Sequence, residues 1–242
     1  MNRRAAPRLA LLVGLGAWAA FALLAGLVAA GHGAPSALDR ALLSWSVGHR
    51  PPVAVAVARG LTATGTGAVP YALAALAGLI AARTPRQRLP AALLGMVCLA
   101  AGQAVRYGVM DLVARARPPH AGWRTSASGW SFPSGHTTTA ALAAGLLVLA
   151  LCLRAPRGRT VLCGAAVCWA AAVGLTRVFL GVHWFTDVLG GWLFATGWLA
   201  LLLAAATRRP PGRLLPAPGG TAPPTPSDAD GAAGTGGPGR GR

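Results

Sequence analysis

Six stretches of about 20 mostly apolar residues limit what this chain can fold into more than any other feature of its sequence. A helix of roughly 20 residues crosses the hydrocarbon core of a bilayer. Helices are favoured over strands because strands in lipid need alternating polarity and a closed barrel. The sequence therefore predicts an all-α, polytopic membrane protein with a six-transmembrane-helix bundle over residues 9–30, 66–82, 89–109, 135–153, 160–180 and 187–207.

The composition agrees with a membrane protein. Hydrophobic residues make up 54% of the 242 residues and charged residues only 11%, whereas about a quarter of a soluble domain is charged. The 22 basic residues are all Arg and the five acidic residues are all Asp, so the net charge is +17. Such a charge can indicate nucleic-acid binding, but 14 of the Arg residues lie in the tails and short links. We therefore expect no nucleic-acid partner. The many Ala, Gly and Arg residues, without Lys, are typical of a GC-rich bacterial genome.

The arginines also orient the chain in the membrane. They gather before the first stretch, between the second and third, between the fourth and fifth, and after the sixth. The positive-inside rule places these segments in the cytoplasm. We expect a cytoplasmic N-terminus over residues 1–8, a membrane domain over 9–207 and a disordered, Pro/Gly-rich cytoplasmic tail over 208–242. The first stretch is longer than a signal-peptide core, so we expect it to stay as an anchor.

Polar residues gather at the opposite, outer ends of the stretches. Arg115 and Arg117 follow the third stretch, and a Pro-Ser-Gly-His segment at 133–136 opens the fourth. Free N–H groups at a helix start attract anions, although an ordinary start capped by Ser has the same sequence. His183 and Asp187 lie one turn apart if their segment is helical. A carboxylate at this spacing can bind one imidazole nitrogen and leave the other free as nucleophile or base; a purely structural contact is the alternative.

Taken in order, these clusters resemble the motifs of the type 2 phosphatidic acid phosphatase superfamily. The resemblance covers roughly residues 60–207. Two positions depart from the family pattern: Thr176 replaces a usual Ser and keeps the hydroxyl, and Met110 replaces a Lys. The residues that match are Arg117-Pro118, Pro133-Ser134-Gly135-His136, Arg177, His183 and Asp187.

The resemblance implies a role for each matching residue. His183 would attack phosphorus and form a phosphohistidine, Asp187 would orient it, and His136 would protonate the leaving oxygen and later help to activate water. Guanidinium groups suit phosphate because their planar fork matches its geometry. No group of carboxylates resembles a metal site, so we expect a metal-independent mechanism with no cofactor. The residues expected to bind the phosphoryl oxygens are Arg117, Ser134, Gly135 through its amide, and Arg177.

Arg106 is a further candidate for the phosphate site, because Met110 removes a cation that the family pattern has. Arg106 lies four residues before Met110 and on the same face of a helix. Its longer side chain could therefore take the place of the Lys. The alternative is that Arg106 extends only to the outer membrane interface.

We therefore expect a hydrolase of lipid phosphates or diphosphates at the outer face of the cell membrane. The resemblance implies phosphatidic acid, phosphatidylglycerol phosphate or polyprenyl diphosphate as substrates, with membrane lipids as surroundings. Three alternatives stay open: a lipid phosphotransferase that uses the same His pair, a lipid-binding pseudophosphatase that lost catalysis with the Lys, and a structural scaffold. The sequence does not determine the oligomeric state.

Overall fold

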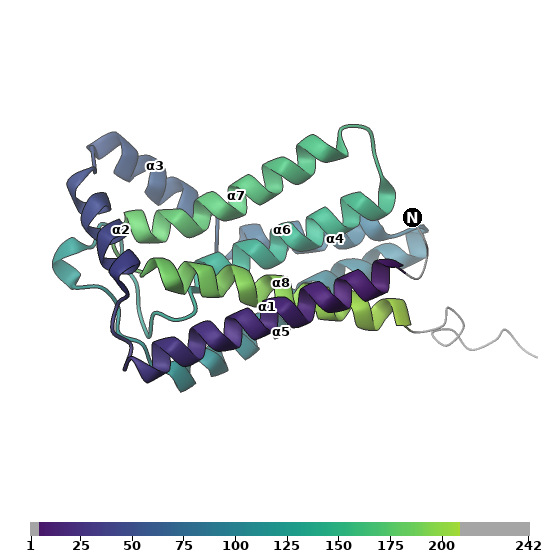
Figure 1. Cartoon of the computed structure of the whole chain (residues 1–242). Coiled ribbons are helices and arrows are strands. Elements are labelled where there is room, and N and C mark those ends of the chain that lie inside the picture. The colour runs from purple at the N-terminus through teal and green to yellow at the C-terminus, as the bar shows by residue number, and fades with distance from the viewer. Residues whose placement is uncertain (1–4, 209–242) are drawn as a thin grey trace, which may run out of the picture. The chain divides into compact units, whose positions relative to one another are not determined.

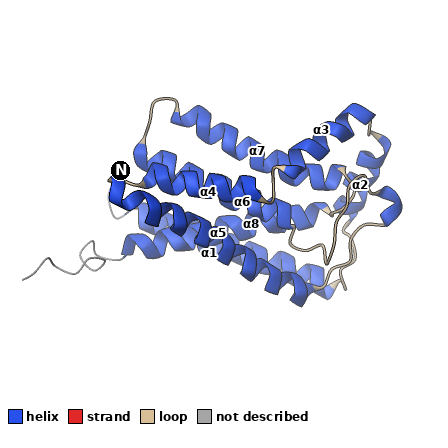
Figure 2. Cartoon of the chain, turned by 180° about the vertical axis from the view of Figure 1, so that it is seen from behind, coloured by secondary structure: helices blue, strands red, loops and turns tan. Residues whose placement is uncertain are grey.

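The protein is helical throughout the part that the structure, a computed structural model, describes: residues 5–208 contain no strand (Figure 2). This confirms the all-α prediction. The predicted tail lies outside the described residues, apart from Arg208. In chain order the helices are α1 (Ala5–Ala30), α2 (Ala37–Gly48), α3 (Pro52–Ala63), α4 (Ala68–Ala81), α5 (Pro85–Val113), the short 3-10 helix η1 (His120–Gly122), α6 (Gly135–Arg154), α7 (Arg159–Phe179) and α8 (Phe185–Arg208) (Figure 1).

Six membrane crossings are consistent with these helices. The five helices α1, α5, α6, α7 and α8 are each long and apolar enough to span a bilayer. A sixth crossing results if α3 and α4, which bend by 50° at the break between them, together form one span. The predicted second span, 66–82, is therefore corrected: α4 alone has 14 residues and is too short to cross. Gly67 in the break has a φ of +68°, a conformation that glycine adopts without strain.

Two helices, α2 and α3, were absent from the prediction. The polar side of α2 faces the protein and its apolar side faces outward: Asp39 and Ser46 are buried, whereas Leu38 and Trp45 are exposed. Hydropathy alone gives no span in such a short segment, so the prediction had no helix there. A capping box does mark its start, because Ser36 and Asp39 bond to each other's backbone N–H groups.

Helix α6 lies at the centre of the bundle and contacts α4, α5, α7 and α8. Its apolar side chains form the main core with those of its neighbours; Leu142 and Ala143 are fully buried beside Leu99 of α5. Helices α4 and α5 approach closely because Gly78 has no side chain: a Cβ there would collide with the Ala91 backbone. The central position of α6 brings its first residues to the middle of one end of the bundle.

The connections divide between the two ends of the bundle. In Figure 1 the short links 82–84 and 155–158 lie at the right-hand end, where α1 begins, and the longer loops 114–134 and 180–184 lie at the left-hand end with α2 and α3. The Arg-rich links are therefore opposite to the phosphatase-like motifs. This arrangement is the one that the positive-inside rule requires for the predicted orientation, which stays a prediction.

Candidate active site

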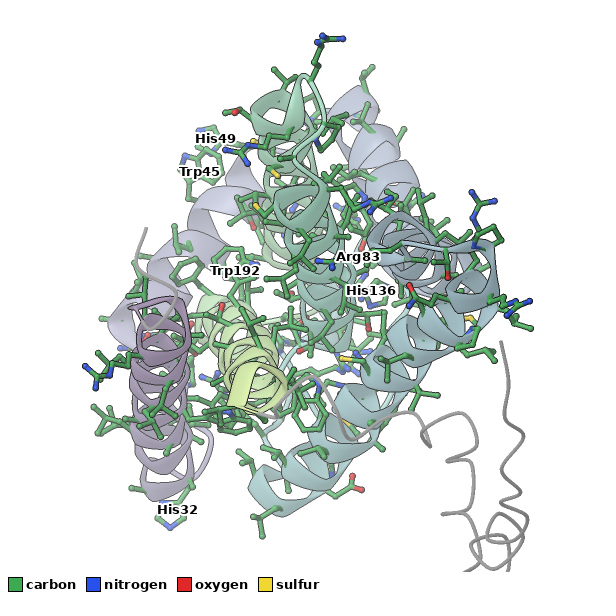
Figure 3. The ribbon with its side chains drawn as sticks, turned by 90° about the vertical axis from the view of Figure 1, so that its right-hand side faces the viewer. His32, Trp45, His49, Arg83, His136 and Trp192 are labelled. Atoms are coloured by element: carbon green, nitrogen blue, oxygen red, sulfur yellow. The ribbon has the colours of Figure 1, made fainter. Side chains whose placement is uncertain are left out.

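A cavity of about 660 Å³ lies where the three motifs meet, between α5, α6, α7 and the loops 114–134 and 180–184. In the end-on view of Figure 3, His136 lies inside the bundle, whereas His32 and His49 lie at its edge. Ser134 and Asp187 are also predicted site residues, but they are fully buried behind the cavity wall. The predicted site residues that line the cavity are Arg106, Arg117, Gly135, His136, Arg177 and His183.

His183 and Asp187 are in contact, although not as one turn of a helix. His183 lies in the loop before α8, which begins at Phe185. Its Nδ1 is 3.2 Å from Asp187 Oδ2, and the backbone N–H of Trp184 donates to the same oxygen over 2.9 Å. The sequence placed the pair one turn apart only if its segment is helical, and here His183 precedes the helix whereas Asp187 lies within it. Asp187 faces back over the start of α8, as an acidic residue in a capping box does, and this position brings its carboxylate to the imidazole.

The hydrogen bonds of His183 assign its tautomer. Arg117 Nη1 lies 2.9 Å from His183 Nε2, and a guanidinium can only donate. Nε2 is therefore the acceptor and the ring proton is on Nδ1, donated to Asp187. Burial lowers the pKa of His183 to about 4, against the opposing effect of Asp187. His183 is thus neutral near pH 7, with the Nε2 lone pair directed toward Arg117 and the cavity, as a nucleophile requires.

Arg117 is fixed in place by backbone carbonyls. It donates to Gly129, Ser128 and Trp130 from the loop before α6, and to Val182 before His183, over 2.7–3.0 Å. These contacts join the two loops that form the mouth of the cavity. Because the guanidinium is held before any ligand arrives, binding of an anion would require little reorganisation of Arg117.

Arg177 lines the cavity from the last turn of α7. Its side chain is buried, and Nη1 donates to Thr62 Oγ1 over 3.0 Å. Its Nε is buried without a hydrogen-bond partner in the part of the chain that the structure describes. A buried donor without a partner costs about 1–3 kcal/mol, and a phosphoryl oxygen in the adjoining cavity would satisfy it.

Arg106 points into the bundle and lines the cavity. Its side chain is only 3% exposed, donates to Gln103 Oε1 over 2.7 Å and contacts Met110 Sδ at 3.4 Å. The guanidinium also packs against the start of α6, where a Cβ on Gly135 would be 3.4 Å from its Cζ. Among the residues that the structure describes, no carboxylate is within ion-pair distance of Arg106. A buried guanidinium without a counter-ion favours an anionic ligand in the cavity.

Ser134 links the start of α6 to the start of α8 through hydrogen bonds behind the cavity wall. Its hydroxyl accepts from Thr137 Oγ1 over 2.9 Å, and its backbone N–H donates to the Asp187 carbonyl over 3.0 Å. Ser134 makes no side-chain cap on α6, so the simple capping alternative is not what the structure shows. The first N–H groups of α6, from Gly135 onward, lack partners within the helix and begin at the cavity wall.

Sequence reasoning named Arg115 in the first motif but missed its contact with Asp187, and it missed Asp39 altogether. Arg115 lies two residues before Arg117 and is only 1% exposed. It forms ion pairs with Asp187 at 2.6 Å and with Asp39 at 3.0 Å. Asp39 belongs to α2, which the prediction lacked. The capping-box sequence from Ser36 to Asp39 would have indicated the helix, but nothing in the sequence indicated this ion-pair partner.

The family model described as the PAP2 superfamily matches residues 91–211, half of the chain. The protein belongs to the PAP2 superfamily. Its matched segment contains every predicted site residue, from Arg106 to Asp187. A metal site was not expected, and within residues 5–208 no three His, Cys, Asp or Glu side chains are grouped to hold one; independence from metal stays a prediction.

Named relatives in this superfamily are lipid phosphatases. The chain is 40% identical over 79 residues to the lipid A 1-phosphatase of Rhizobium etli (33% of this chain, 30% of that protein). It is 44% identical over 80 residues to phosphatidylglycerophosphatase B of Bacillus subtilis (31% and 38%). It is 36% identical over 73 residues to the undecaprenyl-diphosphatase of Sulfolobus acidocaldarius (30% and 32%). These matches span only about a third of each relative's length.

A solved structure extends the likeness to most of the bundle. The crystal structure of a transmembrane PAP2 type phosphatidylglycerolphosphate phosphatase from Bacillus subtilis has a TM-score of 0.65 and 26% sequence identity to this chain. The match covers 80% of this chain and 94% of the other. This agreement supports the transmembrane fold beyond the segment that the sequence comparisons match.

Proposed function

We propose that this protein hydrolyses a lipid phosphate or diphosphate at the outer face of the membrane through a phosphohistidine intermediate. The observation that carries the proposal is the orientation of the His183 ring. Asp187 binds its Nδ1, so that Nε2 keeps its lone pair and faces Arg117 and the cavity. His136, Arg106 and Arg177 line the same cavity. A neutral imidazole among buried cations is suited to attack a phosphoryl group, because catalysis of phosphoryl transfer depends mainly on positioning and on stabilising charge.

The first step transfers the phosphoryl group to the enzyme. His183 Nε2 forms a bond to phosphorus as the bond to the lipid oxygen breaks. His136, which takes up a proton when the anionic phosphate binds beside it, donates that proton to the leaving oxygen. Arg117 exchanges its contact with Nε2 for a phosphoryl oxygen, and Arg106, Arg177 and the Gly135 amide bind the others. Ser134, behind the cavity wall, supports the start of α6 through its hydrogen bonds to Thr137 and to the Asp187 carbonyl. The imidazole becomes cationic when it is phosphorylated, and the Asp187 carboxylate on Nδ1 stabilises that charge.

The second step returns the enzyme to its starting state. His136, now neutral, accepts a proton from a water molecule whose oxygen attacks the phosphohistidine. The bond between phosphorus and Nε2 breaks, inorganic phosphate leaves, and His136 is protonated again. An acceptor alcohol in place of water would give a phosphotransferase with the same residues.

The substrate has its phosphate at the outer surface and its hydrocarbon in the bilayer. The cavity lies at the end of the bundle that the positive-inside rule places outside, and nearby surface residues such as Tyr107, Leu112 and Trp130 are exposed. Phosphatidic acid, phosphatidylglycerol phosphate and polyprenyl diphosphate fit this description. The names of the relatives add lipid A to the compounds worth testing.

A panel assay tests this function. The purified protein in detergent is given each of these four lipids, with EDTA in one set of samples and a divalent metal in another, and both lipid binding and the release of inorganic phosphate are measured. We expect release from at least one lipid. Release that requires a divalent metal would contradict the metal-independent mechanism, and transfer of phosphate to an added alcohol would identify a phosphotransferase. Binding without release from any lipid would favour the pseudophosphatase.

A further inference from the structure

Asp39 is a buried carboxylate that no part of the proposed chemistry uses. It is fully buried on α2 and joins three segments of the chain. Oδ2 accepts from the Ser36 N–H at 3.0 Å and from Arg115 Nη2 at 3.0 Å, and Oδ1 accepts from the Thr186 N–H at 2.8 Å. The Thr186 hydroxyl adds a contact of 2.8 Å to Oδ2. Burial by itself raises the pKa of Asp39, but these hydrogen bonds outweigh it and lower the pKa, so the group is ionised.

Arg115 connects Asp39 to the His183–Asp187 pair. Its Nη1 donates to Asp187 Oδ1 and to Thr186 Oγ1, both at 2.6 Å, while Nη2 donates to Asp39. One guanidinium is therefore shared between two carboxylates. Asp187 keeps its second oxygen, Oδ2, for His183. The direction of that oxygen depends on where Arg115 and the first turn of α8 are held, and Asp39 holds both.

We propose that Asp39 is a positioning residue for the His183–Asp187 pair, acting through Arg115 and Thr186 to hold Asp187 in line with the imidazole. Its effect on turnover rests on the proposed function. The family model begins at residue 91, so the residue lies outside the segment that defines the superfamily. Because Asp39 belongs to α2, the packing of this helix against the bundle helps to set the geometry of the active site.

Helix α2 has other anchors, so removal of the Asp39 charge should leave it in place. Ser46 Oγ contacts the Val178 carbonyl at 3.4 Å, and Arg50 donates to the Gly122 carbonyl at 2.6 Å and to Ser46. The Asp39→Asn variant keeps the shape of the side chain and one carbonyl acceptor. Its main effect should therefore be on the alignment and charge of Asp187 rather than on the fold.

The test compares Asp39→Asn with Asp111→Asn, a matched control that removes the same charge from an exposed position at the end of α5. We expect Asp39→Asn to lower kcat at least tenfold with KM within twofold, and Asp111→Asn to change neither by more than twofold. Equal kcat values in the two variants would overturn the proposal. Melting temperatures of the purified proteins show whether both are folded.

A double variant separates positioning from general structural damage. If Asp39 acts through Asp187, its substitution should change kcat less than threefold in an Asp187→Asn background, because effects of residues that act as a unit are not additive. A full tenfold loss in that background would overturn the proposal. If Asp39→Asn does not fold, Thr186→Val takes its place: it keeps both charges, and we expect at least a threefold loss of kcat. An unchanged kcat would again overturn the proposal.

Orthovanadate adopts the trigonal bipyramidal geometry of phosphoryl transfer. Its binding can be measured without any turnover, so it tests the role of Asp39 separately from the proposed function. If the wild-type protein hydrolyses no lipid phosphate, the proposed function fails. Calorimetry then decides the role of Asp39: we expect vanadate to bind at least fivefold more weakly to Asp39→Asn than to Asp111→Asn. Equal affinities, or no vanadate binding by the wild type, would count against the positioning role.

Discussion

The Arg115 guanidinium lies 2.6 Å from the Asp187 carboxylate, and both side chains are almost completely shielded from solvent. Asp39 on the other side of Arg115 completes a buried group of two carboxylates around one cation. Removal of one partner from a buried pair leaves an uncompensated charge, which typically costs about 3–5 kcal/mol. The stability of this end of the bundle should therefore depend strongly on Arg115.

The first prediction concerns that stability. Arg115→Met should lower the free energy of unfolding by about 3 kcal/mol or more, because Asp39 and Asp187 would then face each other without a cation. Thermal unfolding in detergent measures the change. Arg86→Met, which removes an exposed Arg from α5, serves as the control. Similar melting temperatures for the two variants would show that the ion pairs contribute little.

The second prediction concerns the nucleophile. His183→Ala should abolish turnover, and Asp187→Asn should lower kcat by about 10³–10⁴, as loss of the orienting Asp does in a comparable triad. A substrate with a radiolabelled phosphate should label the wild-type protein in an acid-labile, base-stable form. Labelling that persists in His183→Ala would remove His183 from this role.

The third prediction concerns the leaving group. If His136 protonates the leaving oxygen, His136→Ala should slow hydrolysis of a lipid phosphate much more than hydrolysis of an activated aryl phosphate, whose leaving group needs no proton. The ratio of kcat/KM for the two substrates measures this difference. Equal losses on both substrates would indicate that His136 serves binding or folding instead.

The fourth prediction concerns Arg106. Arg106→Ala should lower kcat/KM at least tenfold, because it removes a buried cation from the cavity. Met110→Lys should restore part of the loss, since residue 110 lies one turn further along α5 and also lines the cavity. Gln103→Ala removes the hydrogen bonds of Gln103 to Arg106 and Thr139 but keeps the Arg106 cation, so it should have a smaller effect. Full activity of a well-folded Arg106→Ala protein would eliminate the compensation.

The fifth prediction concerns topology. In a variant whose four native cysteines are replaced by Ala, Cys at the exposed Ala121 should react with a membrane-impermeant thiol reagent in intact cells. Cys at the exposed Arg157 should react only after lysis. The neighbouring Gly158 in the same link is not used, because its φ of +76° disfavours a side chain. The opposite labelling pattern would invert the orientation and place the site on the cytoplasmic side.

Local sequence was sufficient for features that depend on neighbouring residues. Apolar length predicts α1, α5, α6, α7 and α8 because a helix in lipid satisfies its own backbone hydrogen bonds. The contact of His183 with Asp187 was also predictable, since the two are four residues apart. Its geometry was not, because His183 lies in the loop before α8 and only Asp187 lies in the helix.

The location of Arg106 shows where sequence reasoning stopped. From the sequence, this residue could extend to the membrane interface or turn into the phosphate site. The rotation of a helix in a membrane is set by packing against its neighbours, and here that packing turns Arg106 toward Gly135 and the cavity. No property of residues 85–113 alone contains this information.

The sequence by itself determined the membrane class, the five long apolar helices and the set of residues suited to phosphate chemistry, because hydropathy and motif spacing are local properties. Only the tertiary structure decided which of these residues share one cavity and what holds them there. Asp39 and Asp187 meet at Arg115 although they are 148 positions apart in the chain. Such a contact depends on how α2 packs against α8, and buried ion pairs form only where packing excludes water from both partners.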